Sequence, residues 1–388
     1  MKIFHTADWH LGKRIQGVYM TEDQRYILQR FAETVEREKP DAIVIAGDLY
    51  DRAVPPADAV ELLNEVIEQL VLELETPVIA IAGNHDSPDR LEFGTRLMKA
   101  RGLHLSGTFK FPIEPVILGD EHGEVHIHPV PYADPAFVRE RFGEEEIRTH
   151  DDAMRILIQR MTEQLDPRAR HVFVGHAFVT PGAREEENTS DAERPLSVGG
   201  AEYVAAEHFS PFDYVALGHL HRGHQVGSGP VYYSGSPLKY SVAEAHHHKG
   251  FLCVELGASG VSDLRHIPLE PKRDLRQLEG TLEQIVSGEP SDDYIFVTLL
   301  DEGPVLYPME KVRAVYPNVL HIERKITLPA NDAAKLYKSV ADGKGRPDPV
   351  SLFAAFYKEV TDMPLSEEKK RYFEQIYEQT LLAEGERV

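Results

Sequence analysis

KIFHTADWHLGKR, at residues 2–14, decides the fold of this chain, because a short apolar run in it ends at Asp8 and His10. Four later blocks repeat the arrangement, namely GDLYDR (47–52), GNHDSPDR (83–90), GH (175–176) and LGHLHRGH (217–224). Apolar runs of this length are typical of buried strands and are too short for core helices. The sequence therefore predicts strands that end in polar side chains, whose loops can converge on one site.

The polar residues of these blocks have the chemistry of metal ligands. A single histidine after a strand is usually an ordinary hydrogen-bonded residue, but five such blocks in one chain are not expected by chance. The set comprises Asp8, His10, Asp48, Asn84, His85, His176, His219 and His221. Mixed nitrogen and oxygen donors of this kind suit a pair of divalent metal ions. The glycines Gly47, Gly83, Gly175 and Gly218 either allow a close approach of backbone to the site or take a positive φ at the turn.

The order and content of the blocks, with YSGSPLKYS at residues 233–241, resemble the calcineurin-like binuclear metallophosphoesterases. Within them the chain is most similar to the SbcD family of bacterial nuclease subunits, and the match is closest over residues 1–265. The resemblance implies an α/β fold with a four-layer αββα sandwich, a small α+β capping domain and a C-terminal helical tail that binds a partner.

The resemblance also implies roles for single residues. One metal ion would take Asp8, His10, Asp48 and His221, and the other would take Asp48, Asn84, His176 and His219. The expected ions are two Mn²⁺ per chain, although Zn²⁺ and Fe²⁺ suit the same ligands. His85 would contact the phosphate and act as the catalytic residue, by offsetting charge or protonating the leaving oxygen.

Two aspartates near these ligands have roles that the sequence leaves open. Asp86 is expected either to orient His85 or to cap the next helix, and the sequence favours the second role at least as much as the first. Archaeal and eukaryotic relatives carry a histidine at the position of Asp51, so the family pattern assigns no role to this aspartate.

The charge of the chain bears on its substrate. A net charge of −22, from 42 basic and 64 acidic residues, argues against DNA binding through a broad basic face. A nuclease is still compatible, because bound cations reverse the local potential, and a partner can supply much of the DNA affinity. Candidate contacts to DNA phosphates are Lys13, Arg14, Arg52 and Arg90, with solvated surface charge as the alternative. Ser236 and Tyr240 are weaker candidates for contacts with DNA or with the core.

Cys253, the single cysteine, excludes an internal disulfide and is expected to be a small buried hydrophobe. No apolar run approaches the length of a membrane span, and no leader with a charged and then an apolar segment is visible. We therefore expect a cytoplasmic protein that associates with the nucleoid when it is on DNA, with no membrane partner.

Composition and periodicity divide the chain into four segments, residues 1–268, 269–328, 329–349 and 350–388, of which the third is a linker by composition. The resemblance implies that the first is the nuclease domain, the second the cap and the last the tail. The expected helices of the first segment are Thr21–Lys39 with Thr21 as its cap, Pro55–Leu74, Pro88–Arg101 and Asp152–Leu165, with a hairpin in Gly107–Pro131. The cap should contain a helix at Leu275–Val286, a strand at Asp293–Leu300, a helix at Pro308–Tyr316 and a strand at Val319–Lys325. A mobile loop is expected at Arg184–Arg194, with a guard over DNA entry as the alternative. A solvated loop is expected at His246–His248, with a metal-binding tract as the alternative.

The tail should form two amphipathic helices, Val350–Val360 and Glu367–Leu382, beyond a Gly/Pro linker. Two short helices so separated from a core are suited to docking on a partner. The partner-binding candidates are Phe353, Phe356, Tyr357, Phe373 and Tyr377. The resemblance implies that this tail binds the ATPase SbcC, which uses the ATP, in an assembly with two copies of each chain. It also implies a homodimer through the helices Pro55–Leu74 and Pro88–Arg101.

The resulting hypothesis is a Mn²⁺-dependent DNA nuclease subunit of an SbcC–SbcD complex, which acts in DNA end processing, repair and recombination. The family implies ATP-dependent 3′→5′ exonuclease action on double strands and endonuclease action on single strands and hairpins. Two alternatives remain: a phosphodiesterase or phosphatase for a small nucleotide or a phosphoprotein, and a scaffolding protein at DNA ends.

Overall fold

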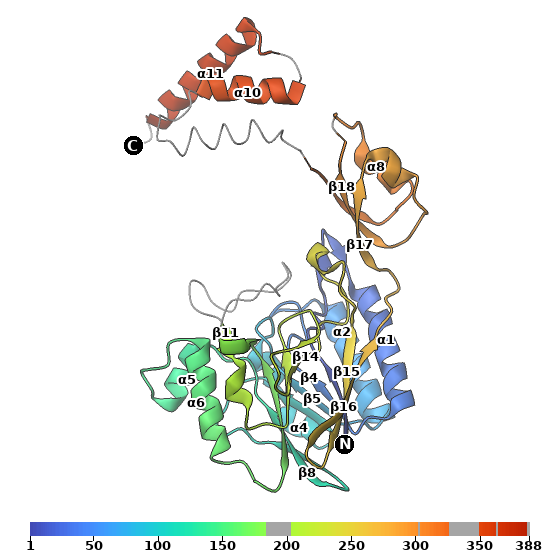
Figure 1. Ribbon diagram of the computed structural model, residues 1–388, viewed down its shortest axis with the longest axis vertical. Coiled ribbons are helices and arrows are strands. Elements are labelled where there is room, and N and C mark those ends of the chain that lie inside the picture. Colours follow the sequence, from blue (N-terminus) through green and yellow to red (C-terminus); the bar gives the residue numbers. More distant parts are fainter. Residues whose placement is uncertain (184–202, 302, 326–348, 362–363, 386–388) are drawn as a thin grey trace. The chain divides into compact units, whose positions relative to one another are not determined.

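Two six-stranded sheets, packed face to face, form the centre of the computed structural model (Figure 1). The structure describes residues 1–183, 203–301, 303–325, 349–361 and 364–385. They belong to two compact units, residues 1–325 and residues 326–388. The loop predicted at Arg184–Arg194 and most of the predicted linker, up to residue 348, lie outside the described residues.

The first sheet has the order β16-β15-β1-β4-β5-β6. Its strands are β1 (Lys2–Thr6), β4 (Ala42–Ile45), β5 (Val78–Ile81), β6 (Leu103–Ser106), β15 (Gly250–Gly257) and β16 (Gly260–Pro268). From β1 to β6 neighbouring strands are parallel, whereas β15 and β16 add an antiparallel edge. β4 and β5 are buried along their whole length, as continuous apolar runs in a covered parallel sheet should be.

The second sheet has the order β13-β14-β12-β9-β8-β7. Its strands are β7 (Val116–Asp120), β8 (Gly123–Pro129), β9 (Arg170–His176), β12 (Tyr214–Gly218), β13 (His224–Gln225) and β14 (Val231–Tyr233). β7 and β8 form the hairpin that was predicted within Gly107–Pro131. Two small pairs stand apart from the main sheets: β2 (Arg14–Ile15) with β3 (Val18–Tyr19), and β10 (Phe178–Thr180) with β11 (Tyr203–Ala205).

Helices cover the outer faces of both sheets and complete four layers (Figure 1). They are α1 (Thr21–Glu38), α2 (Ala57–Glu68) with its π-helical continuation η1 (Gln69–Glu73), α3 (Pro88–Glu92), α4 (Thr95–Lys99), α5 (Pro135–Phe142) and α6 (His150–Thr162). Short turns of 3-10 helix occur at η2 (Pro181–Ala183), η3 (Ala206–Phe209) and η4 (Val242–Glu244).

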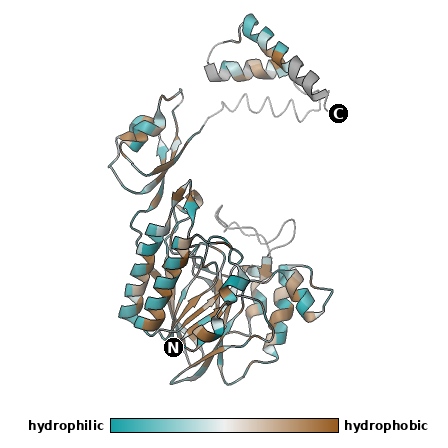
Figure 2. Cartoon of the chain, turned by 180° about the vertical axis from the view of Figure 1, so that it is seen from behind, coloured by the Kyte–Doolittle hydropathy of each residue, from teal (hydrophilic) through white to brown (hydrophobic). Residues whose placement is uncertain are grey.

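The apolar faces of these helices explain the layers. Phe31 of α1 packs against Phe4 and Phe251 of the first sheet. Leu157 of α6 belongs to a cluster with Phe173 of the second sheet, and a third cluster fills the space between the sheets. Apolar colour is accordingly concentrated on the central strands (Figure 2). The predicted αββα sandwich is confirmed.

Several predicted helix boundaries were wrong in detail. Thr21 is not the cap of α1: it is the first helical residue, and its hydroxyl donates to Asp58 at 2.8 Å. The helix predicted at Pro88–Arg101 is divided, because Gly94 takes a φ of 74° and separates α3 from α4. α6 begins two residues earlier than predicted, since Thr149 and Asp152 form a capping box there.

The segment predicted to be the cap, called the cap below, forms a three-stranded parallel sheet with helices between its strands. Its elements are β17 (Leu275–Gly280), α7 (Leu282–Val286), β18 (Tyr294–Leu299), α8 (Pro308–Arg313) and β19 (Val319–Arg324). The single helix predicted at Leu275–Val286 was wrong, because its first half is β17. The leucines of this stretch have helical spacing, but six residues pair with β18, and Thr281 starts a new helix. Long-range pairing here outweighs the local pattern.

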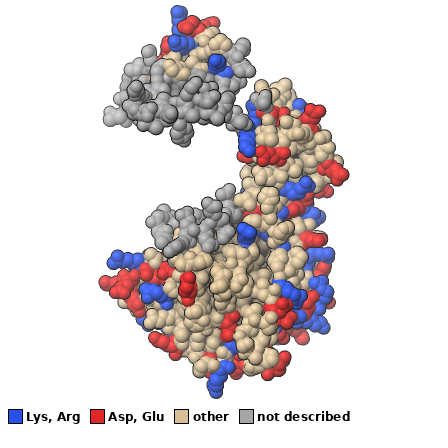
Figure 3. Space-filling view, in the orientation of Figure 1, with Lys and Arg blue, Asp and Glu red and all other residues tan. Residues whose placement is uncertain are grey.

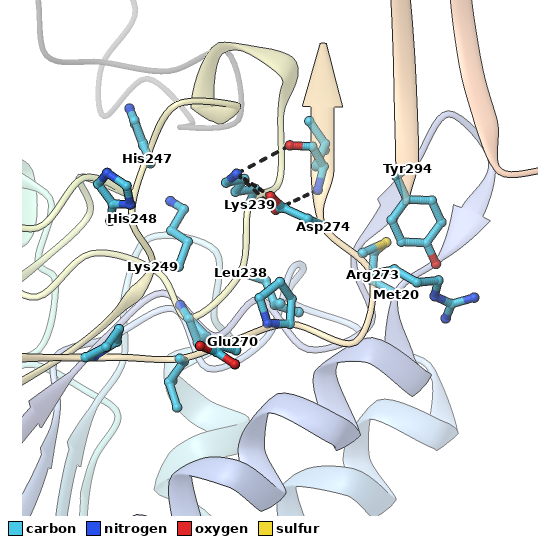
Figure 4. Close-up of a pocket in the computed structure, with 15 residues that line it drawn as sticks. Met20, Leu238, Lys239, His247, His248, Lys249, Glu270, Arg273, Asp274 and Tyr294 are labelled. Carbon is cyan, nitrogen blue, oxygen red and sulfur yellow. Dashed lines mark hydrogen bonds and ion pairs between the residues drawn. The ribbon is translucent and has the colours of Figure 1, made fainter. Parts of the chain in front are cut away.

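Charged groups join the cap to the sandwich. Asp23 of α1 is fully buried and accepts hydrogen bonds from the Arg273 guanidinium, at 2.9 Å from Nε, and from the Tyr294 hydroxyl at 2.8 Å. Lys239 donates to Asp274 at 3.0 Å beside them. A cavity of about 280 Å³ lies along this junction, and Figure 4 shows Lys239, Asp274, Arg273 and Tyr294 around it.

The second unit contains α10 (Pro349–Thr361) and α11 (Glu367–Gly385), close to the two predicted tail helices. The rings of Phe353 and Phe373 are stacked between them, with centroids 4.1 Å apart. Part of the aromatic stripe therefore holds the two helices together. No helix among the described residues is long and apolar enough to cross a membrane.

Candidate metal centre

The predicted site residues converge because the sheets place the carboxyl ends of their parallel strands at one edge. Asp8 and His10 follow β1, Asp48 follows β4, and Asn84 follows β5 in the first sheet. In the second sheet His176 ends β9, directly opposite Gly218 at the end of β12, and His219 and His221 come next. The predicted ligands of one site thus come from both sheets.

The backbone at these strand ends is unusual. Asp8, His10, Asp48 and His219 all have positive φ values, of 54°, 45°, 51° and 105°. Such conformations cost about 1–3 kcal/mol each for residues other than glycine and persist where surrounding structure holds them. Here the amide of Asp8 donates to the Gly47 carbonyl at 3.0 Å, and that of His10 donates to the Asp48 carbonyl at 2.9 Å.

The predicted close approach is confirmed at Gly47, Gly83 and Gly218, whereas a Cβ atom on Gly175 would meet the ring of Phe173. A Cβ atom on Gly83 would lie 2.2 Å from Oδ1 of Asp48, and one on Gly218 would lie 2.0 Å from the Ala46 carbonyl oxygen. Either contact would displace the backbone that carries a site residue.

One group of donors contains Asp8, His10 and His221, whose ligand atoms lie within 4.8 Å of one another. Nε2 of His10 is 3.0 Å from Nε2 of His221. Burial lowers the pKa of both rings, so both are held in the neutral form that binds metals.

A second group contains Asp8, Asp48 and His176. Nδ1 of His176 donates to the Ala46 carbonyl at 2.9 Å, and Nε2 therefore faces Oδ1 of Asn84 at 2.9 Å and Oδ2 of Asp48 at 3.3 Å. The same Oδ2 atom is 3.7 Å from Nε2 of His10. Asp48 thus lies between the two groups, as a bridging ligand would.

The electrostatics of this second group attract positive charge. Burial opposes protonation of His176, but the carboxylates of Asp48 and Asp8 outweigh burial and raise its pKa to about 9. Burial likewise opposes ionisation of Asp48, but His176 and His10 outweigh it and hold the pKa of this carboxyl well below its usual range. Lone-pair donors packed this closely fit divalent cations.

His85 lies beside the two groups, and with His10 and Asp51 it forms a third set of side chains that could hold a metal ion. Its amide donates to Oδ1 of Asp48 at 2.9 Å, and Nδ1 of its half-buried ring donates to the Asp51 carbonyl at 2.8 Å. The ring makes an edge contact with His10, with centroids 4.7 Å apart. Asp51 itself forms an ion pair with Lys13 at 2.8 Å.

Asp86 does neither of the two things expected from the sequence. Its carboxylate accepts from the backbone amides of Leu49 at 3.1 Å, Tyr50 at 2.9 Å and Gly83 at 2.9 Å. Burial and the nearby Asp48 carboxylate raise its pKa to about 7, against the opposing effect of the three N–H donors. Asp86 therefore ties the loop after β4 to the loop after β5.

Comparison with known proteins follows this geometry. The model of the calcineurin-like phosphoesterase family matches residues 1–223. The SbcD chain of the nuclease SbcCD from Staphylococcus epidermidis (strain ATCC 12228 / FDA PCI 1200) is 34% identical over 371 residues, which cover 95% of each chain. The chain belongs to the SbcD family of calcineurin-like phosphoesterases. This SbcD-family chain is therefore a phosphoesterase, a hydrolase whose fold implies divalent metal ions.

A second family model, described as the type 5 capsule protein repressor C-terminal domain, matches residues 271–361 of the SbcD-family chain. Among solved structures, a dimetal phosphatase from Danio rerio aligns with 70% of this chain and 99% of its own, at 14% identity and a TM-score of 0.40. A protein from Thermus thermophilus aligns with 68% of this chain and 98% of its own, at 11% identity and a TM-score of 0.36.

The structure of this SbcD-family member brings most of the predicted ligands into direct contact. The His219 ring lies one step further out, with its centroid 5.4 Å from that of His176, while its amide donates to Asp8 at 3.0 Å. The assignment of each ligand to one ion stays a prediction. Of the four predicted DNA contacts, Lys13 lies beside the site, where it pairs with Asp51, and Arg14, Arg52 and Arg90 are exposed.

The two weaker candidates for contacts with DNA or with the core belong to the core. Ser236 is fully buried, and Tyr240 is 3% exposed, with its hydroxyl bonded to the Trp9 carbonyl. Cys253 is buried as predicted. Residues 246–248 are not part of any metal-binding group within the described residues.

Sequence reasoning missed the residues that hold the ligands. The Gln24 side chain donates to the carbonyls of Trp9 at 3.1 Å and His10 at 2.8 Å, and accepts from the Gly12 amide at 3.1 Å. The one available sign was the helical spacing of this polar residue from the apolar residues Ile27, Leu28 and Phe31 of α1. Glu244, which accepts from Nδ1 of His221 at 3.0 Å, stands in a short turn that no motif marks.

Proposed function

We propose that this chain is the Mn²⁺-dependent DNA nuclease subunit of an SbcC–SbcD assembly, with ATP-dependent 3′→5′ exonuclease action on double strands and endonuclease action on single strands and hairpins. The observation that carries the proposal is the convergence of two carboxylates, an asparagine and histidines from both sheets around Asp48. The name of the Staphylococcus epidermidis relative, a nuclease subunit, points to a nucleic acid as the substrate.

The residues of the site divide the work of phosphodiester hydrolysis. Bound divalent ions would supply a water of lowered pKa and would offset charge on the phosphate. Asp48, between the two donor groups, sets the spacing of the ligands. Since Nδ1 of His85 is engaged by the Asp51 carbonyl, Nε2 is the atom left for a phosphate or leaving-group oxygen. Lys13 adds positive charge at the edge of the site.

Charge supports a partner in DNA binding. On the face drawn in Figure 3, lysine and arginine are scattered among aspartate and glutamate instead of forming a continuous basic surface. With a net charge of −22, much of the affinity for DNA would come from SbcC, which would also bind the ATP.

The tail offers a surface for SbcC. Phe353 and Phe373 stack on each other. Phe356 is 60% exposed, Tyr377 is 37% exposed, and Tyr372 and Ile376 are exposed to a larger fraction than Tyr377. Aromatic and aliphatic side chains left on one helical pair are suited to an apolar groove of a partner. Tyr357 lies between the two groups, half-buried against Phe353.

A second copy of the chain would bind at the helices after β4 and β5. Phe93 and Leu97, in and beside α3 and α4, are 84% and 81% exposed, and Val60 of α2 is also exposed. Single exposed apolar residues are ordinary, but neighbouring large ones mark interaction sites. A dimer here gives an assembly of two chains with two SbcC chains. Replacing Phe93 and Leu97 by Glu should give a monomer by analytical ultracentrifugation.

One experiment tests the function as a whole. Hairpin DNA, duplex DNA and bis-p-nitrophenyl phosphate are incubated with the chain, with and without SbcC, ATP and Mn²⁺. We expect Mn²⁺-dependent cleavage of hairpin DNA, and duplex degradation when SbcC and ATP are added. Asp48→Ala should abolish all three activities, and Asp89→Ala, an exposed position in α3, should leave them unchanged. Cleavage of the small diester without any cleavage of DNA would favour a small-substrate phosphodiesterase, and binding of DNA ends without hydrolysis would favour a scaffold.

A further inference from the structure

A buried chain of polar groups lies behind His221. Glu244 is fully buried, and its Oε1 atom accepts from Nδ1 of His221 at 3.0 Å. Lys249, which is 8% exposed, donates to the other carboxylate oxygen of Glu244 at 2.6 Å. The same ammonium group donates to the His221 carbonyl at 2.7 Å and to the Ser236 hydroxyl at 2.9 Å.

These contacts leave His221 little freedom. A carboxylate accepts hydrogen bonds and donates none, so the hydrogen of the neutral ring must be on Nδ1. The lone pair is then on Nε2, which points to the donor group and lies 3.0 Å from Nε2 of His10. Because Lys249 holds both Glu244 and the backbone of His221, the ring and its acceptor are fixed relative to each other.

The buried ion pair of Glu244 and Lys249 is explained less well by stability than by its hold on His221. A buried ion pair adds little net stability, because the cost of desolvating both charges offsets their attraction. Apolar side chains could fill the same space. A hydrogen-bond acceptor at this position, however, selects the tautomer and the orientation of a ring that binds a metal, and here Glu244 is that acceptor.

We propose that Glu244, anchored by Lys249, is a positioning residue that presents Nε2 of His221 to a divalent cation and so sets the affinity of one of the two metal sites. This inference rests on the proposed two-metal centre. Lys249 also lines the cavity at the junction with the cap, where Figure 4 shows it beside His248. The positioning pair therefore spans the distance from the metal centre to that cavity.

Glu244→Gln tests the proposal with almost no change of volume. An amide can give its oxygen to only one neighbour, and Lys249 requires an acceptor. The amide nitrogen would then face Nδ1 of His221 and donate to it, which selects the opposite tautomer. We expect Mn²⁺ to bind about 10–100-fold more weakly at one site, as is usual for such partners of metal-bound histidines, and normally at the other.

Equilibrium dialysis against Mn²⁺ counts both ions, and the melting temperature of the metal-free protein reports on folding. The matched control is Asp120→Asn, a carboxylate-to-amide change in the buried Asp120–Arg170 ion pair, far along β9 from His176. It should leave both Mn²⁺ affinities at the wild-type values. Lys249→Met, which removes the anchor but keeps the acceptor, should weaken the same single site by a smaller factor and decides the matter if Glu244→Gln does not fold.

Two wild-type affinities in a folded Glu244→Gln or Lys249→Met protein would overturn the proposal. Equal weakening of both sites together with a lower melting temperature would assign the pair a structural role and would also overturn it. If the wild-type chain itself bound fewer than two ions, the two-metal centre would fail, and the inference with it.

Discussion

Replacing Asp86 by alanine should loosen both halves of the metal centre at once. The carboxylate holds the amides of Leu49 and Tyr50, next to Asp48, and the amide of Gly83, next to Asn84. Two loops from neighbouring strands thus depend on one side chain. Its removal should therefore affect folding and metal binding together.

The magnitude follows from the three donors. A buried N–H group left without an acceptor costs about 1–3 kcal/mol. For three such groups the loss in the free energy of unfolding would be about 3–9 kcal/mol. Relaxation of the loops or entry of water should keep the loss in the lower half of this range. In Asp86→Asn the amide oxygen can replace Oδ2, which accepts from Leu49 and Gly83, so only the Tyr50 amide is lost. That variant should lose about 1–3 kcal/mol.

Urea unfolding of the metal-free protein at neutral pH measures these losses, and equilibrium dialysis measures Mn²⁺ binding. Asp89→Ala, an exposed neighbour, is the control and should stay within about 0.5 kcal/mol of the wild type. The reasoning is refuted if Asp86→Ala unfolds at the wild-type urea concentration, or if Asp86→Asn is as unstable as Asp86→Ala.

Three further predictions concern other parts of the molecule. His85→Leu should keep both Mn²⁺ ions, by dialysis, but lose about 10²–10⁴ in the cleavage rate, because it removes a proton donor and not a ligand; loss of an ion would assign His85 to the metal. Burial lowers the pKa of His5 from 6.5 to about 3, and its neutral ring accepts from Tyr214 and donates to Leu217. The unfolded state therefore binds more protons than the folded state below pH 6.5. The stabilising contribution of His5 is complete above that pH and falls by about 1.4 kcal/mol per pH unit as the solution is acidified. Urea unfolding at pH 7.5, 6.0 and 5.0 should show that the free energy of unfolding of His5→Gln depends less steeply on pH than that of the wild type, and an equal slope would contradict this account. Deleting residues 348–388 should leave small-diester cleavage and the melting temperature of the first unit unchanged, but the truncated chain should no longer bind SbcC in a pull-down assay. Phe356→Glu alone should also abolish binding to SbcC. A large drop in the melting temperature of the truncated chain would instead mean that the tail stabilises the sandwich.

The sequence by itself determined the chemistry of the site and the architecture around it. Short apolar runs that end in Asp8, Asp48, Asn84, His176 and His219 predict buried strands whose polar ends meet, and the structure has these strands. Such runs are local, and the carboxyl ends of parallel strands must share one edge of a sheet. The glycines before the predicted ligands were informative too, because a close approach of two backbone segments leaves no room for a side chain.

Only the tertiary structure decided which groups hold the ligands in place. Asp86 acts on amides 36 and 37 residues away, Gln24 clamps the loop that carries His10, and Glu244 meets His221 across a separate turn. β17 was hidden for a similar reason, because its leucines have helical spacing and its strand character comes from pairing with β18. Hydrogen bonds between distant segments produce no periodic pattern in the sequence. Which donor meets which acceptor depends on how the sheets bring the segments together.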